Sequence, residues 1–121
     1  MESILTTVKL HVNVPEDYKA FDSEITDHIN TVFFDLHQMG VGPSKPFFIE
    51  DKTSEWSEFD PDGDMKALIS YMKNRVRLLF DPPANSSQLA AIERQIERFE
   101  WRLNWHAETN KYKSQEEIQN G

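Results

Sequence analysis

The residues that come closest to a metal-binding motif are three aspartates in the run Asp60-Pro61-Asp62-Gly63-Asp64. Alternating carboxylates bind Ca²⁺ in EF-hand loops, which need a glycine at the sixth position and a bidentate glutamate at the twelfth. Counted from Asp60, those positions hold Met65 and Tyr71, so the motif fails at both. Carboxylates before a helix also complement its N-terminal dipole. We therefore predict that these aspartates begin a helix and bind no metal.

The histidines offer no second site for metal binding or catalysis. No two of them have the i, i+4 spacing that places two ligands on one helix face, the four being His11, His28, His37 and His106. There is no cysteine to complete a zinc site, no glycine-rich phosphate loop and no nucleophile elbow. The sequence therefore predicts a protein that is not an enzyme and needs no cofactor.

A different chemistry, the recognition of another protein, is indicated near the C-terminus. Arg94, Arg98 and Arg102 recur every fourth residue and so share one helix face, with glutamates beside them. One interpretation is a solvated face with ion pairs inside the helix. The other is a stripe that contacts a neighbouring subunit, where guanidinium groups meet carboxylates.

Two tryptophans four residues apart, Trp101 and Trp105, lie off the main apolar repeat of the same segment. They imply a second buried surface, either inside the monomer, against Trp56 and Phe59, or across an interface. Tryptophan and arginine are enriched at binding hot spots. These tryptophans therefore join the three arginines as candidate inter-subunit contacts.

Composition limits the class of protein. The chain has 121 residues, enough for one domain, and 38% of them are hydrophobic. Its formal net charge of −8 disfavours binding to a nucleic acid backbone. No stretch resembles a signal peptide or a membrane span, and cysteine is absent. We expect a soluble protein made in the cytoplasm, with no membrane partner.

Apolar periodicity predicts an all-α domain of four helices. Ser3 caps a first helix through Leu10, and Asp22 caps a second that ends at Gly40. Phe47-Phe48-Ile49 is predicted to be a loop, and Ser54 to open a single helical turn. The third helix starts at about Asp62 or Asp64.

A double proline sets the geometry of the last two helices. The third helix must end at Phe80-Asp81, before Pro82-Pro83, and a fourth runs from about Ser86 to Ala107. So short a corner predicts an antiparallel hairpin. Its core is predicted to contain Leu79, Phe80, Leu89, Ile92, Ile96 and Phe99. Residues 108–121 are polar and are predicted to form an extended tail outside the 1–107 domain.

Three runs in this order resemble the head–tail connector (adaptor) proteins of tailed bacteriophages. They are His28–Phe33 with its close at Gln38–Pro43, then Arg75–Pro83, then Glu100–Asn104. The resemblance covers roughly Ser3 to Ala107.

The resemblance implies a structural virion protein at the head–tail junction, assembled in the host cytoplasm. Subunits of that family form a ring, commonly of twelve copies, between the portal and a neck, stopper or tail-completion protein. DNA passes through the ring without specific binding. The family's C-terminal segment reaches toward the portal, so the resemblance implies portal contacts by the tail, with Lys111, Tyr112, Lys113 and Ile118 as candidates.

Two other classes stay open from the residues alone. One is a small acidic helical module with a regulatory or nucleic-acid-associated role, which a DNA mobility shift at physiological salt would reveal. The other is a catalytic or metal-dependent protein, which metal analysis of purified material would reveal.

Overall fold

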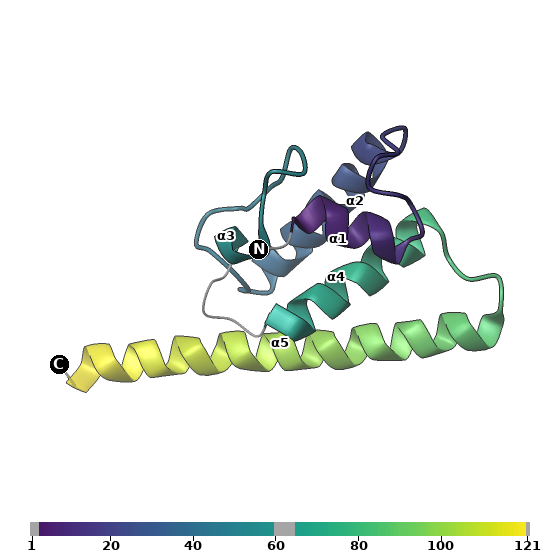
Figure 1. Cartoon of the computed structure of the whole chain (residues 1–121). Coiled ribbons are helices and arrows are strands. Elements are labelled where there is room, and N and C mark those ends of the chain that lie inside the picture. Colours follow the sequence, from purple (N-terminus) through teal and green to yellow (C-terminus); the bar gives the residue numbers. More distant parts are fainter. Residues whose placement is uncertain (1–2, 60–64, 121) are drawn as a thin grey trace.

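The computed structural model describes residues 3–59 and 65–120, with side chains described through residue 105, and it is all-α as the sequence predicts. Its helices are α1 (Ile4–His11), α2 (Asp22–Gln38), α3 (Trp56–Phe59), α4 (Met65–Phe80) and α5 (Ser86–Asn120). In Figure 1 α1, α2 and α4 lie together on one side of α5, and α5 runs on past them toward the C-terminus. Four of these helices are the predicted ones, and α3 is the predicted single turn after Ser54.

Helix α1 begins as its sequence predicts. The Ser3 hydroxyl accepts a hydrogen bond from the Thr6 amide, which satisfies one of the unpaired donors of the first turn. The buried face of α1 includes Ile4, Leu5 and Val8. The amide of Ile4 donates to the Ser54 carbonyl, so the start of the chain is joined to the segment that leads into α3.

The start of α2 differs from the prediction. Its N-cap is Phe21 and has no side-chain capping bond, whereas Asp22, predicted as the cap, is the first residue of the helix. The Asp22 carboxylate is instead 2.6 Å from the ammonium of Lys9. Lys9 is only 2% exposed. Its ammonium also donates to the carbonyls of Glu16 and Tyr18. A buried charge of this kind needs such partners, and they bind the α1–α2 loop to α1.

The end of α2 confirms the predicted glycine cap. Gly40 has a φ of 81°, and the amide of Val41 returns to the carbonyl of Leu36. The loop that follows contains Phe47 and Ile49 and forms no strand within the described residues. Asn30 on α2 makes two hydrogen bonds to the backbone of Ile49, at 2.8 and 3.0 Å, and so fixes this loop against the helix.

Helices α4 and α5 pack antiparallel, because residues later on α4 contact residues earlier on α5. Asn74 donates to Gln95 and Tyr71 donates to Glu100, both at 3.2 Å. On α5, Ile96 and Leu103 are buried in the main core, and the partly buried Ile92 and Phe99 pack against it.

Two parts of the predicted hairpin are corrected. Leu79, predicted to be buried, is 45% exposed, because α4 already turns Val76 and the partly buried Phe80 toward the core. The other correction concerns the tail. Helix α5 continues to Asn120 instead of ending near Ala107, so the backbone of 108–120 is helical and not extended. No proline or glycine interrupts residues 86–120, and the tail is rich in Glu, Lys and Gln, which favour helix.

Candidate interaction surfaces

The outer face of α5 carries two exposed tryptophans. Trp101 and Trp105 are 68% and 58% exposed, and their rings stack at 5.9 Å with an angle of 11° between the planes. At 3.6 residues per turn, Trp105 lies about 180° around the helix from the buried Ile96. The two indoles therefore lie on the side of α5 that faces away from the core.

This exposure decides between the two interpretations of the tryptophan pair. Trp56, which was one possible partner inside the monomer, is buried beside α1 and donates from its indole nitrogen to the Thr7 hydroxyl. Phe59, the other, packs with Phe33 at a centroid distance of 4.9 Å. Packing of the tryptophan pair against Trp56 and Phe59 is therefore wrong.

The three predicted arginines, Arg94, Arg98 and Arg102, are all exposed on α5. Glu93 and Glu97, one residue before the first two, are exposed as well. In the part of α5 whose side chains are described, Arg94 and Arg98 form no ion pair with a glutamate of the helix. The outer face of α5 thus offers two cations and two carboxylates that no ion pair of the described residues uses.

A partly buried polar network holds the inner side of α5 in place. Arg75 on α4 bonds to the Asp35 carboxylate and to the Tyr71 hydroxyl, both at 2.6 Å. Tyr71 in turn donates to Glu100 of α5. Burial raises the pKa of Tyr71 to about 12, although the nearby Arg75 works in the opposite direction, so the phenol stays a donor. The network links α2, α4 and α5 and fixes the rotation of α5 about its axis.

Beside this network, a shallow groove runs between α5 and the end of α2. It is lined by Met39, Glu97, Glu100, Trp101 and Asn104. One carboxylate of the groove, that of Glu100, is used by Tyr71, whereas Glu97 is exposed. The groove therefore combines the apolar side chains of Met39 and Trp101 with two carboxylates and one amide.

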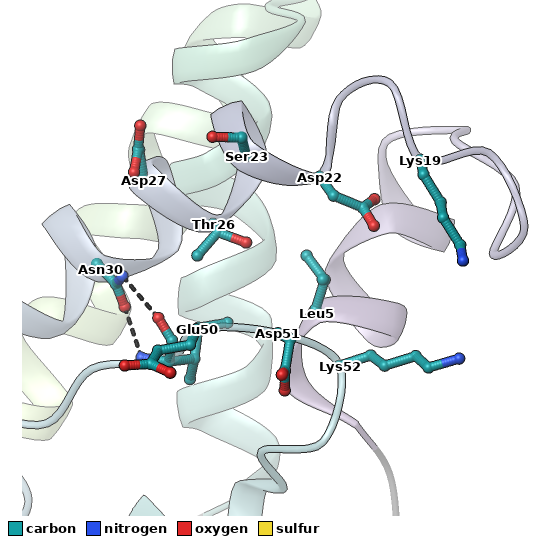
Figure 2. Close-up of a pocket in the computed structure, with 11 residues that line it drawn as sticks. Leu5, Lys19, Asp22, Ser23, Thr26, Asp27, Asn30, Glu50, Asp51 and Lys52 are labelled. Carbon is teal, nitrogen blue, oxygen red and sulfur yellow. Dashed lines mark hydrogen bonds between the residues drawn. The ribbon is translucent and has the colours of Figure 1, made fainter.

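A second groove, between α2 and the loop after Ile49, is shown in Figure 2. Its labelled side chains include Lys19, Asp27, Asp51 and Lys52, which are all exposed. Asp22 also lines it but is already paired with Lys9. Charges of both signs along an open groove are typical of a solvated polar surface.

One exposed apolar cluster was not predicted from the sequence. The ring of Phe21 contacts that of Tyr18 at 5.5 Å and that of Phe80 at 5.3 Å. Tyr18 is 49% and Phe21 39% exposed. Both belong to the loop that Lys9 binds, so the only signal in the sequence was the local density of aromatic residues.

The remaining predicted site residues lie where side chains are not described. The acidic run, residues 60–64, lies outside the described residues altogether. Lys111, Tyr112, Lys113 and Ile118 have a described helical backbone in α5 but no described side chains. Their contacts stay predictions.

The described residues contain neither a cluster of metal-ligating side chains nor a membrane-spanning helix. Among the described side chains, those of residues 3–59 and 65–105, no three His, Cys, Asp or Glu are grouped so that they could hold a metal ion. Across residues 3–59 and 65–120, no helix has the length and apolar character needed to cross a membrane.

Comparison with known proteins gives one match. The sequence model of a family described as phage connector protein matches residues 4–110. No curated protein and no solved structure matches the chain significantly. The family match spans α1 through most of α5 and includes both the core and the exposed tryptophan face.

Proposed function

The chain belongs to the phage connector protein family, and from this premise we propose that it forms a ring between the portal and the neck, stopper or tail-completion proteins of the virion. The ring extends the channel through which DNA passes, and its function is structural. Subunits contact each other through Arg94, Arg98 and Arg102 together with Trp101 and Trp105.

The observation that carries this proposal is the exposed outer face of α5. Two stacked indoles at 68% and 58% exposure are costly to leave in water, since each can remove a large apolar area from solvent when it is covered. Arginines lie beside them, and this combination is typical of the energetic centre of protein interfaces. A partner that covers this face would remove both indoles from water.

The acidic composition supports the role in a DNA channel. A formal net charge of −8 gives the chain little affinity for phosphate backbones. A wall that repels DNA weakly lets the duplex slide, whereas a basic wall would retain it. We propose that DNA passes the ring without specific binding.

The C-terminal part of α5 is proposed to contact the portal. It is the segment that runs on past the other helices in Figure 1. The candidate anchors are Tyr112 and Ile118, with Lys111 and Lys113 beside them. Because the segment is helical, docking would require less ordering than the binding of an unstructured tail.

The experiment that tests the function is reconstitution with the portal. The purified chain mixed with portal assemblies of the same phage should add one ring to each portal in negative-stain images. Portals that stay undecorated at micromolar chain concentrations would contradict the proposal. A DNA mobility-shift assay at physiological salt serves as the companion measurement, and a clear shift would favour the nucleic-acid-associated alternative.

A further inference from the structure

Charge is arranged around α5 in a way that bears on how two copies can meet. With 3.6 residues per turn, Arg98 and Arg102 lie about 40° and 80° to one side of the midpoint of the tryptophan pair. Glu97 and Glu93 lie about 60° and 100° to the other side. We call Arg98 and Arg102 the arginine edge, and Glu93 and Glu97 the glutamate edge. Arg94 lies at the midpoint, in line with the indoles.

Resting on the proposed ring, we propose that the arginine edge of α5 in one subunit packs against the glutamate edge of α5 in the next, with the two helices parallel. In a ring whose symmetry axis is parallel to α5, all copies of the helix are parallel, and the arginine edge of each copy faces the glutamate edge of the next. An antiparallel pair that meets at the indoles would instead place arginines against arginines, because like flanks face each other in that arrangement. Charge complementarity therefore selects the parallel arrangement.

The spacing along the helix sets the rise between neighbouring subunits. Arg98 of the arginine edge directly follows Glu97 of the glutamate edge, so this arginine is only about 1.5 Å farther along the helix axis than that glutamate. Parallel helices at the same height then oppose Arg98 of one copy to Glu97 of the next. A contact without axial rise closes into a ring, whereas a contact with rise would build a filament.

The directions of the two edges favour a ring over a dimer. The edges point about 140° apart, measured across the tryptophan side. Each contact therefore joins the arginine edge of one subunit to the glutamate edge of the next. The other edge of each subunit then faces outward for contact with a further copy. A row of subunits built in this way curves toward the tryptophan side, because the angle between its two edges is about 40° short of a straight line. A turn of about 40° per subunit closes the row at roughly nine copies. The usual scatter in helix packing angles is wide enough to include a ring of twelve. Indoles of neighbouring subunits meet on the inner side of each contact.

Two reciprocal variants test this contact. R98E/R102E makes both edges acidic, and E93R/E97R makes both edges basic. Each variant alone should lose at least about tenfold in assembled fraction, equivalent to about 1.4 kcal/mol, because like charges then face each other. An equimolar mixture should recover rings with an even number of copies in which the two variants alternate, because acidic edges again meet basic ones. Mass photometry, with a different tag on each variant, measures ring size and composition, both for the chain alone and on its portal.

The controls separate this contact from the function on which it rests. K45E/K52E lowers the net charge by the same amount as R98E/R102E, at two exposed lysines of the loop between α2 and α3, and should assemble as the unchanged chain does. If the unchanged chain forms rings and each reciprocal variant forms them equally well alone, the contact is wrong and the ring stands. A parallel dimer that grows no further would also overturn the contact. If the unchanged chain forms no ring in either setting, the proposed function fails and the contact fails with it.

Discussion

At the scale of single residues, position 42 requires glycine for two reasons, its backbone conformation and the nearby ring of Phe59. Its φ of 96° lies in the region that favours glycine, and a Cβ at this position would collide with the ring of Phe59. Phe59 cannot move away easily, because it packs against Phe33 and Phe47 in the core. Gly42→Ala should lower the free energy of unfolding by about 1–3 kcal/mol in urea titrations.

Gly40→Ala is the matched control for that variant. Gly40 also has a positive φ, 81°, but among the described atoms none crowds its Cβ position. It therefore reports the backbone strain alone, without the collision. Equal losses for the two variants would mean that Phe59 adapts and that the collision contributes nothing.

His11 should make the stability depend on pH. Burial, followed by the charges of Lys73 and Arg77, lowers the pKa of His11 below its usual value. In the unfolded chain the imidazole binds a proton near pH 6.5. The stability contributed by the neutral form is therefore complete above that pH and is lost as the pH falls from there toward the lowered folded pKa.

The measurement is urea unfolding at pH 7.5 and pH 5.5 for the unchanged chain and for His11→Gln, which cannot titrate. The unchanged chain should lose more stability between the two pH values than the variant does. Other titrating groups contribute to both proteins and cancel in the comparison. Equal pH dependence of the two proteins would show that His11 is not the group involved.

At the scale of elements, local signals in the sequence predicted most helix ends. Ser3 begins α1, Gly40 follows the end of α2, and the double proline ends α4 at Phe80, all through backbone chemistry within one turn. The start of α2 could not be predicted in this way. Asp22 is drawn to the ammonium of Lys9, thirteen positions earlier, and periodicity carries no information about such a contact.

The candidate site was predicted in part, for a similar reason. Helical spacing placed Trp101 and Trp105 off the seam of α5, and both are exposed. Spacing alone could not decide whether another element covers them, since that depends on where Trp56 packs, and Trp56 is bound to α1 through Thr7. The polar composition of residues 108–121 predicts an extended tail, yet α5 continues to Asn120, because Glu, Lys and Gln favour helix without burying an apolar face.

The core-facing side of α5 should be sensitive to truncation of its side chains. Ile96 is 7% exposed, so Ile96→Ala leaves a cavity and should cost about 2–4 kcal/mol. Phe99 is only partly buried, and Phe99→Ala should cost less than a fully buried phenylalanine does. Thermal or denaturant unfolding measures both, with the exposed Arg94→Ala as the neutral control. Losses near zero for both core variants would contradict the packing of α5 against α4.

At the scale of the whole molecule, α5 has two parts, one that packs against the core and one that extends beyond it. Its first part, to Leu103, packs against the core, and Leu103 is the last residue of the main core cluster among the residues whose side chains are described. The part beyond residue 107 extends the same helix past the other helices (Figure 1). A rigid continuation of this kind projects its end away from the domain that holds it.

Truncation after Ala107 should therefore separate folding from docking. The shortened chain keeps every core contact described for α5, so its melting temperature should change by less than about 4 °C, the shift that roughly 1 kcal/mol produces in a domain of this size. Its binding to the portal should weaken, because the proposed anchors Tyr112 and Ile118 are removed. Negative-stain images of portals mixed with either chain give the measurement. If the truncated chain decorates portals as fully as the intact one, the portal contact lies elsewhere on the molecule, and the exposed face of α5 before residue 106 becomes the surface to test.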